Sequence, residues 1–150
     1  MKTFKRSGTI PITVLLVLTI LLMTWTVNAG DVSKKDLRRV NKEGPVEVTV
    51  LFLNPLQGDT GDDLSFEVRM STHSVNLDAY QVDALSVVQV DDGKELESLG
   101  WFKPGGGGHH ISGVLKFQGP VPDNAGTLKL IIRDIGSVPE RVFKWNLPLE

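Results

Sequence analysis

A strict alternation of apolar and polar residues between positions 64 and 71 is the feature that most limits what this chain can fold into. Its apolar members are Leu64, Phe66, Val68 and Met70, and its polar members are Ser65, Glu67, Arg69 and Ser71. Successive side chains of a β-strand point to opposite faces of the sheet, so the alternation predicts a strand with one face in a core and the other in water. A strand of this kind needs partners, and the chain is therefore expected to build a sheet.

Six further segments have the apolar content and the period of strands. They span residues 46–52, 85–90, 96–102, 112–118, 127–134 and 141–147. Turn-forming residues separate these segments, and Asp92-Gly93 between two apolar runs is a strong hairpin signal. We predict an all-β fold, a seven-stranded antiparallel β-sandwich of immunoglobulin-like or cupredoxin-like form. The side chains expected in its core are Val48, Val50, Phe52, Leu64, Phe66, Val68, Met70, Leu85, Val87, Leu115, Phe117, Leu128, Leu130, Ile132, Phe143 and Trp145.

The first 30 residues have the pattern of an export signal. Three basic residues, Lys2, Lys5 and Arg6, precede an uncharged run that extends to Gly30. Val27-Asn28-Ala29 supplies small residues at the two positions that a signal peptidase recognises. We predict a cleaved signal peptide. The alternative is an uncleaved membrane anchor, because the run is close to the length that spans a bilayer.

Three segments are therefore expected along the chain. They are a signal peptide or membrane anchor at 1–29, a charged spacer at 30–44 and the β-sandwich domain at 45–150. The spacer is dense in charges of both signs and poor in apolar residues, which is typical of a solvated segment. The predicted location is exported: periplasmic, secreted, or anchored on the outer face of the cytoplasmic membrane.

Charge and cysteine content exclude several classes of protein. Beyond residue 30 the chain carries 13 basic and 18 acidic residues, a formal charge of −5. Nucleic-acid binding needs clustered Lys and Arg, so no nucleic-acid partner is expected. The chain has no cysteine, which excludes disulfides, thiolate zinc sites and a blue-copper site.

Two of the three histidines follow a run of four glycines. The segment at 104–110 is Pro-Gly-Gly-Gly-Gly-His-His. Because glycine loses the most backbone entropy on ordering, this run is expected to be a flexible loop. The third histidine, His73, follows the alternating strand, and Asp78 lies five residues further along the same connection. If successive strands reverse direction, both connections lie at one end of the sandwich.

That histidine end is predicted to hold a divalent transition metal. Imidazoles of His73 and of one or both of His109 and His110, together with the carboxylate of Asp78, suit zinc or copper. The alternatives left open are a small anionic or polar ligand on the same residues, and no cofactor at all, with the histidines only hydrogen-bonded.

The opposite end collects carboxylates from several predicted turns. They are Asp59, Asp62, Asp63, Asp91, Asp92, Glu95 and Asp123, with Asn124 beside them. Calcium prefers several oxygen ligands, so these loops are a candidate calcium site. The alternative is that they are solubilising turns, since Asp is a common turn former.

No catalytic constellation is expected, and the chain is predicted not to be an enzyme. Ser74 or Ser112 with His73 and Asp78 would supply the residue types of a hydrolase triad, but no nucleophile elbow accompanies them. The glycine run lacks the Lys-Ser/Thr and the helix of a phosphate-binding loop.

Residues 46–147 resemble small exported bacterial β-sandwich domains. The runs that carry the resemblance are Thr-His-Ser-Val-Asn-Leu-Asp at 72–78, Gly-Gly-His-His-Ile-Ser-Gly at 107–113, and Ile-Arg-Asp at 132–134 followed by Val-Pro-Glu-Arg-Val-Phe at 138–143. The resemblance implies the fold and export, and it carries no activity. The lack of cysteine departs from cupredoxins and argues against electron transfer.

Two functions stay open. The first is an exported, non-catalytic β-sandwich domain that binds a divalent metal ion or a small ligand at its histidine end. The second is a structural or protein-interaction module of the cell envelope, with an envelope protein as partner and no small-molecule site. Membrane contact is expected only through the N-terminal segment, if it is uncleaved.

Overall fold

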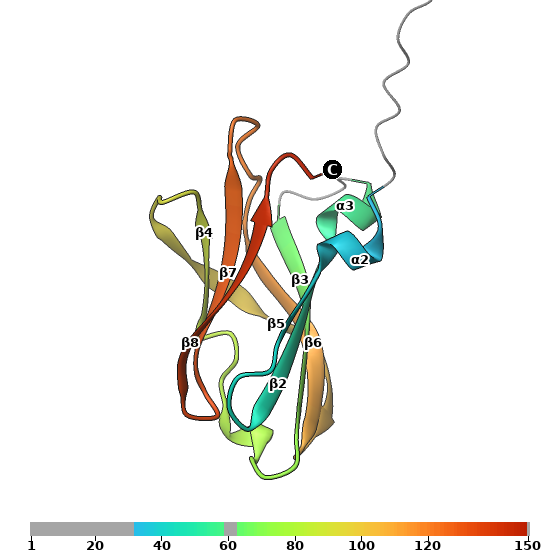
Figure 1. Ribbon diagram of the computed structural model, residues 1–150, viewed down its shortest axis with the longest axis vertical. Helices are drawn as coiled ribbons and strands as arrows, with labels where there is room; N and C mark the ends of the chain where they lie inside the picture. The colour runs from blue at the N-terminus through green and yellow to red at the C-terminus, as the bar shows by residue number, and fades with distance from the viewer. Residues whose placement is uncertain (1–31, 59–62, 150) are drawn as a thin grey trace, which may run out of the picture. The chain divides into compact units, whose positions relative to one another are not determined.

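The computed structural model describes residues 32–58 and 63–149. This part of the chain contains eight antiparallel strands (Figure 1). The strands are β1 Arg38–Asn41, β2 Val46–Phe52, β3 Asp63–Thr72, β4 Ser86–Val90, β5 Glu95–Gly107, β6 His110–Gln118, β7 Thr127–Ile135 and β8 Val138–Asn146. Short helices in the same ranges are α2 Lys34–Leu37, α3 Asn54–Gln57 and η1 Leu77–Ala79. None of the helices in these ranges is long and apolar enough to cross a membrane. The signal peptide or anchor predicted at 1–29 lies outside them.

The strands form one nearly closed, barrel-like sheet in the order β1-β2-β3-β6-β5-β4-β7-β8. Strand β5 joins the two halves of the sheet, because residues 95–97 pair with β4 and residues 98–107 pair with β6. At the far side of the sheet β1 approaches β8, where the Nε of Arg39 donates to the carbonyl oxygen of Lys144 at 2.8 Å. This approach brings the first and last strands together.

All seven predicted strands are present, and an eighth lies in the segment expected to be a spacer. Residues 34–41 form α2 and β1, and Leu37, the last residue of α2, is completely buried. The indole N–H of Trp145 donates to the carbonyl oxygen of Leu37 at 2.9 Å. The spacer prediction is therefore wrong for this part of the segment. Besides Leu37, the pairing of β1 with β2 and the guanidinium of Arg39 over the ring of Trp145 hold this segment to the sheet.

The core is built around a cluster of aromatic rings from strands on both halves of the sheet. The ring centroid of Phe66 lies 5.1 Å from that of Phe52, 5.4 Å from that of Trp145 and 5.9 Å from that of Phe117. All four rings are buried. Aromatic side chains bury a large area each, so this cluster supplies much of the apolar burial that stabilises the sheet.

The predicted phase of one strand is wrong. On β4 the buried residues are Ser86 and Val88, whereas Leu85 and Val87 are only half-buried. The hydroxyl of Ser86 donates to the carbonyl oxygen of Val82 at 2.6 Å, which satisfies it inside the core. This segment has apolar residues on both phases, so its alternation alone does not decide which face turns inward.

Candidate functional site

The glycine run is an ordered hairpin and not the flexible loop that its composition predicts. Strand β5 continues through Gly107, and a two-residue turn at Gly108 and His109 leads into β6. Gly106 has a φ of 85°, and a Cβ there would lie 2.1 Å from the carbonyl oxygen of His110. Gly108 has a φ of 61°. Glycine adopts such backbone conformations without steric cost, so the run builds this hairpin.

The hairpin is anchored to the connection between β3 and β4. The backbone N–H of Thr72 donates to the carbonyl oxygen of His109 at 3.0 Å, and that of Leu77 donates to Gly108 at 2.8 Å. A third bond runs from the N–H of Gly108 to Oδ2 of Asp78 at 2.9 Å. These bonds place His73, which follows Thr72, at the same end of the sheet as the histidine pair. This is the placement that the order of the strands predicts.

The four predicted metal ligands differ in their surroundings. His73, Asp78, His109 and His110 are all exposed. Asp78 uses one carboxylate oxygen to hold the turn of the hairpin. His110 begins β6, where it pairs with Ser71 of β3 and Gly107 of β5. Within residues 32–58 and 63–149, no three His, Asp or Glu side chains are grouped so as to hold a metal ion. The metal site stays a prediction.

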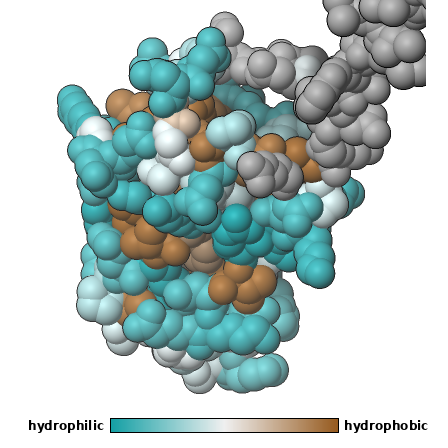
Figure 2. Space-filling model, turned by 45° about the horizontal axis from the view of Figure 1, so that its top comes forward, coloured by the Kyte–Doolittle hydropathy of each residue, from teal (hydrophilic) through white to brown (hydrophobic). Residues whose placement is uncertain are grey.

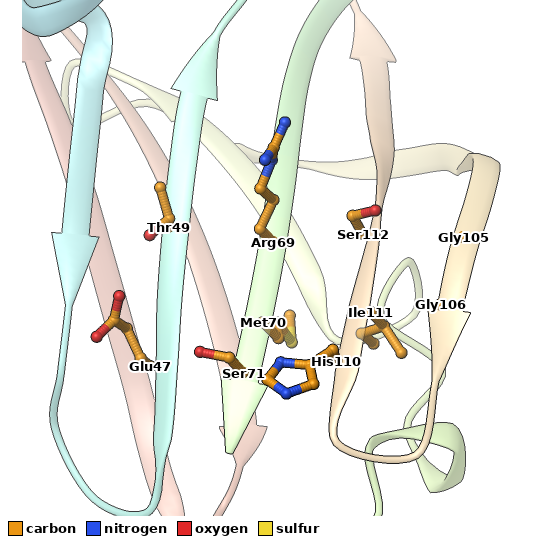
Figure 3. Close-up of a pocket in the computed structure, with 10 residues that line it drawn as sticks. All are labelled: Glu47, Thr49, Arg69, Met70, Ser71, Gly105, Gly106, His110, Ile111 and Ser112. Atoms are coloured by element: carbon orange, nitrogen blue, oxygen red, sulfur yellow. The ribbon is translucent and has the colours of Figure 1, made fainter.

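A shallow groove, which we call the polar groove, opens on the outer face of the sheet at this end. Its volume is about 420 Å³. Residues that line it come from β2, β3, β6 and β5, and they are Glu47, Thr49, Arg69, Met70, Ser71, Gly105, Gly106, His110, Ile111 and Ser112 (Figure 3). Of the predicted ligands, His110 alone belongs to this set.

Cross-strand pairing arranges the polar groove in two rows. One row contains Thr49, Arg69, Ser112 and Gly105, and the next contains Glu47, Ser71, His110 and Gly107. Directly opposed residues on antiparallel strands have Cβ atoms about 4.5–5.5 Å apart, so each row is a line of neighbouring side chains. Figure 3 shows the polar side chains of these rows on adjacent strands: Glu47, Thr49, Arg69, Ser71, His110 and Ser112.

The charged side chains of the polar groove have partners of opposite charge within the domain. Arg69 forms an ion pair with Glu67, and its Nε lies 2.5 Å from Oε1 of that residue. The carboxylate of Glu47 lies 3.0 Å from Nζ of Lys42. In contrast, the hydroxyls of Thr49, Ser71 and Ser112 and the imidazole of His110 form no bond with any described residue. The groove therefore offers hydroxyl and imidazole groups beside two exposed ion pairs.

Carboxylates at the opposite end are engaged by neighbouring groups. Oδ1 of Asp91 accepts from the N–H groups of Gly126 and Thr127 at 3.0 and 2.8 Å. Asp63 pairs with Lys116, Asp92 with Lys129 and Glu95 with Arg133. The Arg133 guanidinium lowers the pKa of Glu95 by hydrogen bonding and by its charge. These contacts match the turn-forming alternative, while Asp59 and Asp62 lie outside the described residues.

That same end presents apolar surface. Two depressions of about 390 and 490 Å³ share Leu64, Pro120, Pro122 and Ala125 in their walls. Figure 2 shows apolar patches among polar side chains where the top of the Figure 1 view comes forward. Polar hydrogen-bonding groups of the kind that line the polar groove are gathered at the other end.

Sequence reasoning missed the groove residues of β2 and β3. Glu47, Thr49, Arg69 and Ser71 occupy the polar phase of two predicted strands, which marks them as outward-facing and nothing more. These residues line a groove only because β6 pairs with β3. The two strands lie about 40 residues apart in the chain. The polar phase of β2 and β3 indicates which side chains face outward, but the sequence does not indicate that β3 pairs with β6.

Known protein families, curated proteins and solved structures provide no match to this chain. The resemblance to small exported β-sandwich domains stays a prediction.

Proposed function

We propose that the domain has immunoglobulin-like rather than cupredoxin-like topology. Without β1, the order along the sheet is β2-β3-β6-β5 followed by β4-β7-β8. If these strands are lettered A to G in chain order, the two groups are A-B-E-D and C-F-G, the arrangement of constant-type immunoglobulin domains. In variable domains the B–C and F–G loops carry recognition residues at one end. Their equivalents here meet at the histidine end, where the N–H of Gly136 donates to the hydroxyl of Tyr80 at 3.2 Å.

We propose that this is a non-catalytic binding domain and that the polar groove holds a small polar ligand. The observation that carries the proposal is the convergence of three unbonded hydroxyls and an imidazole from three strands on one hollow of about 420 Å³. Small-molecule sites typically measure about 300–1,000 Å³. None of these hydroxyls is bonded to the imidazole of His110 among the described residues, so the set lacks the nucleophile–base pair of a hydrolase.

A fragment screen by amide NMR tests this function. Small polar compounds of mixed charge are expected to shift the amide signals of the groove strands, and Ser71→Val is expected to weaken those shifts at least several-fold. Ser74→Val is the matched control, because Ser74 is an exposed serine at the same end but outside the groove. If no compound shifts the groove signals, or if both variants behave alike, the proposal fails.

A divalent metal at the histidines is the second candidate function. The specific observation in its favour is the bond from Thr72 to His109, which joins the backbones next to His73 and His110. Zinc and copper titrations of the natural protein and of His73→Ala and His109→Ala test it directly. Micromolar affinity that both variants lose would support the metal site, and equal affinity in all three proteins would exclude it. If neither a small ligand nor a metal binds, the protein-interaction module becomes the working hypothesis.

Export belongs to the same proposal. Val27-Asn28-Ala29 before Gly30 motivates it, and the mature protein is expected to begin at or near Gly30. The intact mass of protein extracted from a cell envelope measures this directly. A mass that retains the leader from Met1 would favour the membrane anchor.

A further inference from the structure

We infer that the ligand of the polar groove is a neutral saccharide. This inference rests on the proposed function, since it names the ligand class of the same groove. Three features of the groove support it: the kind of hydrogen-bonding group it offers, the pairing of its charges, and an opening at Gly105 that the fold does not require.

The unbonded groups of the polar groove both donate and accept hydrogen bonds. A hydroxyl of Ser or Thr has one donor and two acceptor lone pairs, and a neutral imidazole has one donor and one acceptor. Thr49 and Ser71 lie diagonally on β2 and β3, and Ser112 and His110 lie on one face of β6. Sugar hydroxyls have the same double capacity, whereas a carboxylate only accepts and an ammonium only donates. A polyhydroxylated ligand therefore uses this set more fully than an ion does.

The charges beside these groups do not favour an ionic ligand. Arg69 is paired with Glu67, and Glu47 is paired with Lys42. An anion that contacts the guanidinium of Arg69 would also approach the carboxylate of Glu67, which is bonded to it, and that of Glu47, which lines the same groove. A cation that contacts the carboxylate of Glu47 would also approach the ammonium of Lys42 and the guanidinium of Arg69. Since an ion also loses its hydration on binding, a neutral ligand enters this groove at lower cost.

Gly105 keeps the groove open although its backbone does not require glycine. Its φ lies outside the left-handed region, and the nearest atom to a Cβ built there is Oγ of Ser112 at 3.7 Å, an ordinary contact. Gly106 and Gly108, by contrast, have positive φ angles. The space beside Ser112 is thus empty because residue 105 has no side chain. This leaves an opening beside the hydroxyl of Ser112 in which a sugar ring can lie.

Neutral trisaccharides provide the test. Maltotriose, cellotriose, chitotriose and mannotriose are each titrated to high millimolar concentration into the mature protein and followed by amide NMR. At least one is expected to shift the signals of the groove strands saturably. Gly105→Val, which fills the opening, should reduce that affinity at least tenfold. Ser112→Ala, which removes a hydroxyl without adding bulk, should weaken it by a smaller factor.

The controls separate this inference from the proposed function. Lys144→Val places the same side chain on an exposed position of β8 and is expected to bind as the natural protein does. If charged fragments shift the groove signals while none of the four trisaccharides does, the binding function stands and the saccharide inference is wrong. If neither class shifts them, both are wrong. Saccharide binding that is unchanged by Gly105→Val and by Ser112→Ala overturns the inference as well.

Discussion

Arg141 is a buried cation that is held by carbonyl groups. It is only 1% exposed, and its guanidinium donates to Oδ1 of Asn41 at 3.0 Å, to the carbonyl oxygen of Ile135 at 2.6 Å and to that of Glu43 at 2.8 Å. Burial lowers the pKa of Arg141, and the nearby charge of Glu43 partly offsets this effect. One side chain thus satisfies acceptors from β1, β7 and the turn before β2, where β1 lies close to β8.

Replacing Arg141 with methionine should be strongly destabilising. The variant keeps a long side chain but leaves several acceptors without a donor, at about 1–3 kcal/mol for each group that stays buried. We expect a loss of about 3 kcal/mol or more in the free energy of unfolding, measured by urea denaturation. Arg133→Met is the control, because Arg133 is half-exposed and an exposed ion pair is worth at most about 1 kcal/mol. Equal losses for the two variants would contradict this account of Arg141.

At the scale of elements, the β5–β6 hairpin distinguishes two kinds of glycine. Gly106→Ala forces a Cβ to within 2.1 Å of a backbone oxygen at a φ of 85°, and should cost at least about 2 kcal/mol. Gly105→Ala meets no such contact, so its effect should stay within about 0.5–1 kcal/mol and should be stabilising if anything. Thermal unfolding of the two variants measures the difference. A larger loss for Gly105→Ala would show that the fold, and not the ligand, requires glycine there.

The ion pair between Glu95 of β5 and Arg133 of β7 makes a pH-dependent contribution to the free energy of unfolding. Two guanidinium nitrogens of Arg133 contact the two carboxylate oxygens of Glu95 at 2.6 and 3.1 Å, which lowers the pKa of Glu95 from its ordinary value of 4.5. A carboxyl with a lowered folded-state pKa contributes stability that is present above its unfolded pKa and is lost as the pH falls through the folded pKa. Acidification should therefore remove this contribution.

Glu95→Gln tests that linkage. The difference in urea midpoint between pH 7 and about pH 3 should be smaller in this variant than in the natural protein, because the variant has no proton to gain at this position. Glu97→Gln is the control, since Glu97 is an exposed glutamate on the same strand. If Glu95→Gln keeps the full pH dependence, the pairing with Arg133 does not contribute to acid stability.

At the scale of the whole molecule, the sequence predicts elements better than it predicts neighbours. The alternation between Leu64 and Ser71 and the Asp92-Gly93 turn are local, so they mark strands and a hairpin directly. The pairing of β3 with β6 depends on packing across the whole core, and the polar groove exists only because of that pairing. A local rule also fails at the glycine run. Entropy favours a flexible loop there, but the hydrogen bonds to Thr72, Leu77 and Asp78 order it.

Because β1 lies beside β8, we expect that removing β1 will weaken the whole fold. The charge density of residues 30–44 predicts a spacer. In the structure Leu37 of this segment is buried, and its carbonyl oxygen accepts a hydrogen bond from the indole N–H of Trp145. A chain that begins at Gly44 should therefore be less stable than one that begins at Val32 by at least about 3 kcal/mol, a typical cost for losing one buried leucine. It should also aggregate more readily, because the edge of β2 loses the strand that covers it.

Urea denaturation and light scattering of the two shortened chains measure both effects, and Leu37→Ala and Lys35→Ala in the longer chain separate their causes. Leu37→Ala should reproduce most of the loss in stability, because it removes the buried side chain and leaves β1 in place. Lys35→Ala should change little, since Lys35 is exposed. If the chain beginning at Gly44 is as stable as the longer one, then β1 does not help to hold the sheet closed and the seven strands from β2 to β8 suffice for the fold. If it is less stable while Leu37→Ala is not, the covered edge of β2 and the acceptors that Asn41 and Glu43 offer to Arg141 contribute more than the burial of Leu37 does.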